Sequence, residues 1–239
     1  MNPEVSSRKG VCAVVGIGPG NGAALARRFA SEGYRVALLS RRTDFSSKLA
    51  AELPGARAYA CDAADPASVE RAFSEVQKDL GDVDVLVYNA GSGVFGTVEE
   101  ISPEDFEKSF RVNALGALVS SQQVIAAMKR RGRGSIVFIG ATASRRGNVK
   151  TAAFAPAKAA QRSLAESMAR YLWPLGIHVS LVILDGVVDL PATRERMPNK
   201  PDAFFVKPED LASTAFYLAH QPRSAWSFEV EARPFGESW

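Results

Sequence analysis

Short apolar runs alternate along the chain with longer stretches whose apolar residues recur at helical spacing. The runs are apolar at consecutive positions, which is typical of strands covered on both faces, as in parallel sheets. The stretches between them carry apolar residues mainly on one side, as helices packed on a sheet do. The expected strands are 11–15, 35–39, 56–60, 83–87, 135–139 and 179–184, and the expected helices are 22–32, 46–53, 66–80, 103–130, 155–173 and 208–219.

Proline at the first helical position marks several of these helix starts, as in Asp65-Pro66 and Ser102-Pro103. A regular alternation of strand and helix predicts an α/β fold, a Rossmann-like doubly wound parallel sheet with helices on both faces. No repeat, low-complexity segment or long linker interrupts the 239 residues, so we expect a single domain over 1–239.

Composition adds limits on location and on partners. The chain is 46% hydrophobic and 23% charged, with a formal net charge of +3. No stretch approaches the roughly 20 apolar residues of a membrane span, and residues 1–10 lack the apolar run of a signal peptide. The densest basic cluster, 130–133, lies at an expected helix end and is interpreted as a solvated cap. We expect a cytoplasmic protein that binds neither nucleic acid nor membrane.

Metal and disulfide chemistry have little support in the sequence. The two cysteines, Cys12 and Cys61, lie in apolar strand contexts and have neither metal-ligand nor disulfide-framework spacing. Two histidines, His178 and His220, are too few for a histidine-rich metal centre. We therefore interpret both cysteines as buried core residues and predict no metal site.

A glycine-rich loop follows the first strand and opens directly into a helix. Glycines at such a turn allow positive φ and let backbone N–H groups approach an anionic pyrophosphate at the helix N-terminus. The strand–loop–helix context gives the motif weight that isolated glycines lack. The candidate cofactor-binding residues in this loop are Gly16, Gly18, Gly20, Asn21 and Gly22.

Two arginines at the end of the second strand bear on the choice of cofactor. An acidic residue there accepts from the ribose 2′-hydroxyl of NAD, whereas this chain has Arg41 and Arg42. Guanidinium groups would form charge-assisted hydrogen bonds with a 2′-phosphate, so the sequence favours NADP(H) over NAD(H). The alternative is that both side chains point to solvent.

With Asp62 after the third strand, Asn89-Ala90-Gly91 after the fourth, Asn113 and Lys158, the chain resembles the short-chain dehydrogenase/reductase family over 11–219. The resemblance implies that Asp62 contacts the adenine and that Asn89, Ala90 and Gly91 support the sheet and the cofactor ribose. It also implies that Lys158 binds the nicotinamide ribose and that Asn113 holds a water of the family's proton relay. Gly186 and Val188, after the sixth strand, complete the expected cofactor site.

The chain departs from the family at the positions where its chemistry is done. Phe154, four residues before Lys158, occupies the place of the family's tyrosine acid, and Ala141 occupies that of its serine. The proline and threonine that usually follow the sixth strand are absent too. Thr142 is the candidate substitute hydroxyl, but a hydroxyl is a poor acid. Asp185 and Asp189 are further candidate acids or turn caps, and Lys158 with Asn113 and an ordered water is the favoured proton source.

Two kinds of function fit these substitutions. The first is an oxidoreductase with altered proton delivery that reduces an activated C=C bond or a carbonyl group. Hydride addition to a conjugated C=C bond forms an enolate, which can take its proton from water. The second is a catalytically silent NADP(H)-binding protein that signals occupancy to a protein partner by ordering residues 189–206. A carbonyl reductase that relies on Thr142 is the least favoured reading.

Residues 189–206 contain three prolines and mixed charges, and they follow the sixth strand where ligands bind in this architecture. We interpret them as a substrate lid, with an ordinary surface connection as the alternative, and expect residues 92–98 and 141–149 to line the rest of the substrate pocket. Small residues on the helices 103–130 and 155–173 allow close approach, and in the family these helices pair between subunits. A homodimer or homotetramer is therefore expected, unless these residues pack on the chain's own sheet.

Overall fold

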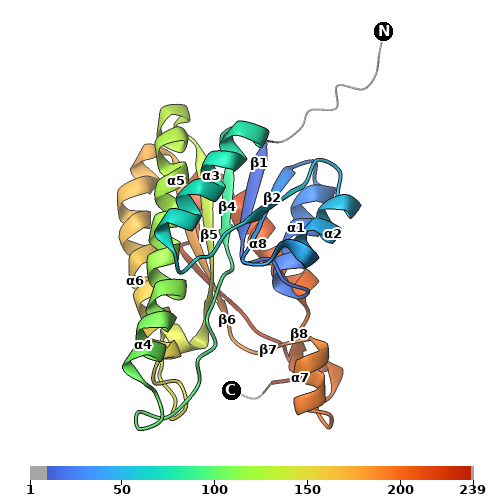
Figure 1. Cartoon of the computed structure of the whole chain (residues 1–239), viewed down its shortest axis with the longest axis vertical. Coiled ribbons are helices and arrows are strands. Elements are labelled where there is room, and N and C mark those ends of the chain that lie inside the picture. Colours follow the sequence, from blue (N-terminus) through green and yellow to red (C-terminus); the bar gives the residue numbers. More distant parts are fainter. Residues whose placement is uncertain (1–9, 238–239) are drawn as a thin grey trace.

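The computed structural model describes residues 10–237, and a seven-stranded parallel sheet forms its centre (Figure 1). The strand order is β3-β2-β1-β4-β5-β6-β9. Residues 1–9 and 238–239 lie outside the described residues. The prediction about a signal peptide, made for residues 1–10, falls almost wholly on them. The strands are β1 Val11–Val15, β2 Arg35–Ser40, β3 Arg57–Ala60, β4 Val85–Tyr88, β5 Gly134–Ala141, β6 Ile177–Leu184 and β9 Glu229–Ala232.

Helices cover both faces of the sheet, which explains why the strands are apolar at consecutive positions. On one face, α1, α2 and α8 pack into a core with residues such as Leu25, Phe29 and Leu211. On the other face, α3, α5 and α6 pack around residues such as Tyr88 and Phe138. The helices are α1 Asn21–Ser31, α2 Thr43–Glu52, α3 Pro66–Leu80, α4 Pro103–Phe110, α5 Gly116–Arg131, α6 Phe154–Leu172, α7 Pro191–Arg196 and α8 Pro208–Ala219. None of the helices within residues 10–237 combines the length and apolar character needed to cross a bilayer.

The direction of winding reverses between β1 and β4, which lie side by side at the centre of the sheet. Cys12 pairs with Val85 and Val15 with Tyr88 in this central register. Loops that leave the carboxyl ends of β1 and β4 therefore diverge to opposite sides and leave a crevice between them. Ligands of open α/β sheets bind at this switch point.

The predicted fold class is confirmed, and two local features differ from the expected elements. The predicted helix 103–130 is interrupted by a π-helical turn, Arg111–Leu115, between α4 and α5. Strand β9 was not predicted, because its alternating Glu229 and Glu231 interrupt any apolar run. Arg145 forms ion pairs with both carboxylates, at 2.6 and 2.5 Å, and so holds the strand beside β6.

The segment that follows β6 forms a small folded unit at the carboxyl edge of the sheet. Its two short strands, β7 Val187–Val188 and β8 Phe205–Val206, pair in parallel on either side of α7. Arg194 on α7 donates to both carboxylate oxygens of Asp189, at 2.7 and 2.8 Å, and to Asp202 at 2.7 Å. These hydrogen bonds hold the pKa of Asp189 below its ordinary value. That this segment acts as a substrate lid stays a prediction.

Gly116, the first residue of α5, lies close to the loop after β3 and to a side chain of β4. A Cβ added there would overlap the Ala63 carbonyl oxygen and the Tyr88 hydroxyl. We expect Gly116→Ala to lower the free energy of unfolding by about 1–3 kcal/mol, because the backbone at Ala63 must move. Urea denaturation measures this loss. Gly147→Ala is the matched control, since nothing lies within 4 Å of its added Cβ; equal stability of the two variants would contradict the prediction.

Candidate active site

The glycine-rich loop passes very close to the end of β4. Gly16 has φ +97°, and an added Cβ would lie 2.5 Å from the backbone nitrogen of Ala90. Only glycine fits this position, because both the backbone conformation and the space exclude a side chain. The Gly16 N–H donates to the Leu39 carbonyl at 2.9 Å, so the loop is fastened to β2 as well.

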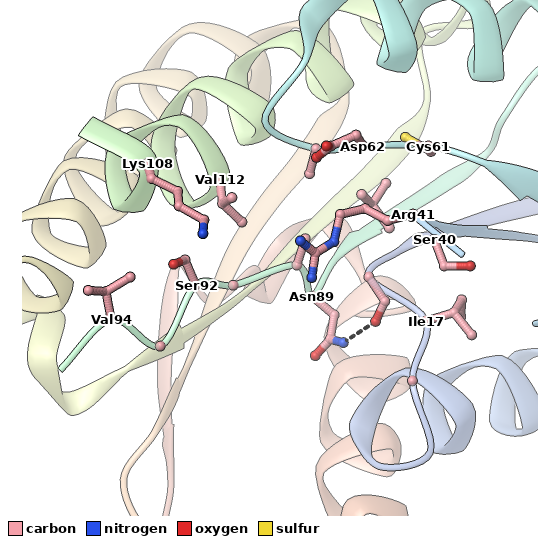
Figure 2. Close-up of a pocket in the computed structure, with 17 residues that line it drawn as sticks. Ile17, Ser40, Arg41, Cys61, Asp62, Asn89, Ser92, Val94, Lys108 and Val112 are labelled. Atoms are coloured by element: carbon pink, nitrogen blue, oxygen red, sulfur yellow. Dashed lines mark hydrogen bonds between the residues drawn. The ribbon is translucent and has the colours of Figure 1, made fainter. Parts of the chain in front are cut away.

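Asn89, directly after β4, holds the loop from the other side. Its Nδ2 donates to the Gly16 carbonyl oxygen at 2.7 Å, the dashed line in Figure 2. The Asn89 N–H in turn donates to Val15 O at 2.9 Å, which continues the pairing of β1 with β4. The predicted supporting role of Asn89 in the sheet therefore has a direct structural counterpart.

A cavity of about 450 Å³ opens between the loops that follow β1, β2, β3 and β4. Arg41 extends into it from the end of β2, and Lys108 reaches it from α4 on the opposite side (Figure 2). Asp62 lies at the far wall, where its Oδ1 accepts from the Ala64 N–H at 2.9 Å. Other predicted cofactor residues that line the cavity are Gly16, Gly18, Asn89, Ala90 and Gly91.

The remaining predicted cofactor residues lie near this cavity without lining it. Gly20 is the N-cap residue of α1, which begins at Asn21, and Gly22 lies in the first turn of that helix. The Asn21 Oδ1 is buried and has no hydrogen-bond partner within residues 10–237, so a donor on a ligand would satisfy it. Arg42 caps the start of α2, and its carbonyl accepts from the Ser40 hydroxyl at 2.9 Å.

Gly186 and Val188 take part in the folded segment after β6. Val188 pairs with Val206, and a Cβ at Gly186 would contact Pro234. The segment reaches the glycine loop through Leu190, whose Cδ2 would lie 2.6 Å from a Cβ added at Gly20. Leu190 of this segment and Gly20 of the glycine-rich loop therefore lie in contact at the start of α1.

The positions of the family's catalytic serine and tyrosine carry apolar side chains in this chain. Ala141 ends β5, and Phe154 begins α6. The Phe154 ring packs on Phe95, with ring centroids 5.2 Å apart, and the Lys158 Nζ lies 6.0 Å from the Phe154 centroid. Phe95 is 62% exposed, so this pair of rings forms an apolar surface beside the lysine.

The Thr142 hydroxyl, the candidate substitute donor, is engaged by its surroundings. It donates to the Asp185 carboxylate, a short contact, and lies 3.4 Å from the Leu184 carbonyl oxygen. The second oxygen of Asp185 accepts from Arg233 Nη1 at 2.6 Å. Thr142 and Asp185 therefore hydrogen-bond to each other, and Asp185 is also the ion-pair partner of Arg233.

Lys158 is buried on the inner face of α6. Its Nζ donates to the Ile139 carbonyl of β5 at 3.0 Å and to the Gln161 Oε1 at 3.0 Å. Burial lowers the pKa of the Lys158 ammonium to about 8. The lysine is therefore close to the boundary between its charged and neutral forms at physiological pH.

Asn113 lies in the π-helical turn, where its Nδ2 donates to the Ser109 carbonyl at 2.9 Å. Its main-chain carbonyl accepts from the Gln161 Nε2 at 3.0 Å. The Gln161 carboxamide therefore links Lys158 with the Asn113 carbonyl directly. The ordered water expected with Asn113 and Lys158 stays a prediction. Gln161 was missed, although its place three residues after Lys158 on an apolar helix face was a visible signal.

Comparison with known proteins identifies the family of this chain. Residues 10–200 match the short chain dehydrogenase family. The 3-oxoacyl-[acyl-carrier-protein] reductase of Rattus norvegicus is 34% identical over 218 residues, which cover 89% of this chain and 92% of that protein. This chain belongs to the short-chain dehydrogenase/reductase family.

Solved structures of the family agree with this assignment. The alcohol dehydrogenase of Thermococcus sibiricus, complexed with 5-hydroxy-NADP, is 28% identical with a TM-score of 0.86, over 96% of this chain and 98% of that one. A blue fluorescent protein from a metagenomic library, in complex with NADPH, is 28% identical with a TM-score of 0.85, over 97% and 99%. The family prediction made from the sequence is confirmed, and the protein is placed among the short-chain oxidoreductases.

Proposed function

We propose that this family member binds NADP(H) in the cavity at the carboxyl edge of the sheet, in preference to NAD(H). The observation that carries the proposal is the position of Arg41, which lines the cavity at the end of β2. Asp62 lies within reach of an adenine there, and the Gly16 turn leaves room for phosphates at the start of α1. The NADP-type ligands of the two structural neighbours support the same choice.

Arg41 contributes more to this preference than Arg42. Both were candidates in the sequence, but only Arg41 is among the residues that line the cavity. A guanidinium that reaches a 2′-phosphate forms charge-assisted, bidentate hydrogen bonds that NAD cannot make. Lys108, on the opposite wall, adds a second positive charge to the cavity.

For the reaction, we infer reduction of an activated C=C bond or carbonyl in which the protein supplies no tyrosine proton. NADPH, when bound, supplies a hydride. Phe154 and Ala141 lack the hydroxyls of the family's catalytic tyrosine and serine, and the Thr142 hydroxyl already donates to Asp185. An enolate, formed when hydride adds to a conjugated C=C bond, takes its proton from water. The Lys158 ammonium would stabilise that enolate charge.

The second candidate function is NADP(H) binding without catalysis. The observation that favours it is the number of polar groups already engaged: Thr142 with Asp185, and Lys158 with Ile139 and Gln161. Anaerobic incubation with NADPH and a panel of enals, enones and ketones separates the two candidates. Loss of NADPH absorbance with any panel member supports the oxidoreductase. Unchanged absorbance with every panel member supports the silent binder.

We also propose that the protein pairs with a second copy through α4, α5 and α6. An apolar groove on this face is lined by Phe110, Ala114, Leu115, Leu118 and Leu164, with Glu107 and Arg111 at its side. The apolar side chains of the groove are half-buried in the single chain, so a partner could bury them further. α6 and the α4–α5 unit are also the helices for which pairing was expected.

Replacing Arg41 tests the choice of cofactor. We expect Arg41→Asp to weaken NADPH binding by about tenfold or more, because a charge-assisted contact is lost and repulsion from the 2′-phosphate replaces it. NADH affinity should change little, so the preference should disappear. Calorimetric titration with both cofactors measures it. Arg42→Asp is the matched control and should have the smaller effect; equal native affinities for the two cofactors would refute the assignment.

Restoring the two hydroxyls tests the account of the reaction. We expect the double variant Phe154→Tyr/Ala141→Ser to gain ketone reductase activity with NADPH, on the order of 10²-fold or more. The tyrosine would donate the proton, with its pKa lowered by the neighbouring Lys158 ammonium. Turnover of a ketone panel is the measurement, with Ala141→Ser alone as the control. If the double variant binds NADPH and reduces no ketone, the silent binder becomes the better account.

Sedimentation tests the pairing of copies. The native protein should sediment as a dimer or tetramer at micromolar concentration, because an assembly would complete the burial of the half-buried apolar groove. Leu118→Glu would place a charge in the groove and should shift the distribution to monomer. Tyr217→Glu, on an exposed site of α8, is the matched control. A native protein that sediments as a single monomeric species would exclude the assembly.

A further inference from the structure

Four polar groups from three elements meet behind the wall of the cavity. The Lys158 ammonium and the Gln161 carboxamide lie on α6, the Asn113 carbonyl lies in the π-helical turn, and the Ile139 carbonyl lies on β5. Asn113 and Gln161 are completely buried and Lys158 is 4% exposed. A glutamine has no packing advantage in such a place, because a leucine would fill similar space without the cost of burying an amide.

The partners of Gln161 fix the orientation of its amide. An ammonium group only donates and a carbonyl oxygen only accepts, so Oε1 must face Lys158 and Nε2 must face Asn113. The two hydrogen bonds are both 3.0 Å long. Gln161 therefore makes a direct bridge between the lysine and the π-helical turn, from the position three residues after Lys158.

With Ile139 and Gln161 as acceptors, the Lys158 ammonium has one N–H left, and its surroundings indicate where it is used. A Cβ placed on Gly91 would lie 3.8 Å from the Lys158 Nζ and 3.5 Å from the Asn113 Oδ1. Gly91 lines the cofactor cavity. The Asn113 Oδ1 is buried and has no hydrogen-bond partner in the described part of the chain. A donor and an acceptor therefore flank the same point of the cavity wall.

A hydroxyl group is the chemical class that fits such a pair, since it accepts one hydrogen bond and donates another. We propose that Gln161 is a positioning residue that ties the Lys158 ammonium to the π-helical turn and so holds it toward a ligand hydroxyl at Gly91. The identity of the hydroxyl, a cofactor ribose, rests on the proposed NADP(H) site; the role of Gln161 does not.

The hydrogen-bond acceptors and the ring near the Lys158 ammonium are uncharged. They are the Ile139 carbonyl on β5, the Gln161 amide and the Phe154 ring on α6, and the Gly91 and Asn113 region beyond them. Burial is the cause of the lowered Lys158 pKa. Because Gln161 is the side chain that accepts from this ammonium, a change of its charge should act directly on the titration of Lys158.

The test is the titration of Lys158 in the cofactor-free protein, followed by NMR of ¹³C-labelled lysine and assigned with Lys158→Arg. Gln161→Glu keeps the shape and adds a negative charge, so the Lys158 midpoint should rise by about one pH unit or more. Gln161→Leu removes the acceptor, so the midpoint should fall. Gln123→Leu on α5, a half-buried glutamine away from the lysine, is the matched control and should leave the midpoint unchanged.

The affinity for NADPH provides a second measurement with a worked-out sign. The ammonium form exists below the pKa, so the affinity of the native protein should fall as the pH rises through about 8. In Gln161→Glu this fall should move to higher pH, and in Gln161→Leu to lower pH. A residue with a packing role alone would change stability and leave both midpoints in place.

Each result decides between the proposals. If Lys158 titrates at the native midpoint in Gln161→Leu, or in Gln161→Glu, the positioning role is overturned. If Gln161→Glu does not fold, Gln161→Leu still decides the question, since it introduces no buried charge. If the native protein fails to bind NADPH while the Lys158 midpoints shift as expected, the proposed cofactor is wrong and the role of Gln161 stands.

Discussion

Where β1 ends, the backbone of Gly16 passes so close to Ala90 that no side chain fits between them. This approach joins the two central strands at the point where the winding of the sheet reverses. The Asn89 amide closes the junction with its hydrogen bond to the Gly16 carbonyl. The cavity and the start of α1 follow from it, because the loops after β1 and β4 diverge from this junction. Arg41 borders the same cavity from the end of β2, to which the Gly16 N–H is hydrogen-bonded at Leu39.

The two halves of the crevice have different chemical character. The half between Arg41, Asp62 and Lys108 is charged and open, as a site for a phosphorylated, polar ligand must be. The half around Phe95 and Phe154 presents aromatic rings. The polar groups near that second half hydrogen-bond to one another: Thr142 donates to Asp185, and Lys158 donates to Ile139 and Gln161.

The sequence predicts most of the fold, because the pattern reports how each element is buried. Strands apolar at consecutive positions can only lie between two layers of helices, and the structure confirms that arrangement. Strand β9 was missed because Glu229 and Glu231 interrupt its apolar pattern. Their ion-pair partner, Arg145, lies far away in the sequence. The π-helical turn at Arg111–Leu115 leaves no mark on an apolar pattern, since it shifts the helical register by a fraction of a turn.

The site was predicted less completely than the fold. Gly16, Asn89 and Lys158 stand in short motifs next to expected strands and helices, so the sequence alone singles them out. The separate roles of Arg41 and Arg42 depend on where β2 ends and α2 begins, which a pattern does not resolve to one residue. Gln161 depends on a carbonyl in the π-helical turn, far away in the sequence, and only the folded chain brings the two together.

The hydrogen bonds of Arg194 with Asp189 and Asp202 give the segment between β7 and β8 a fixed structure of its own. A disordered cover loses conformational entropy when a ligand closes it, and that loss subtracts from affinity. Here the segment from β7 to β8 has its own hydrogen bonds and already touches the glycine loop through Leu190. If a ligand binds beneath this segment, it would have to move a preformed unit, and its occupancy would change the position of the segment rather than its order.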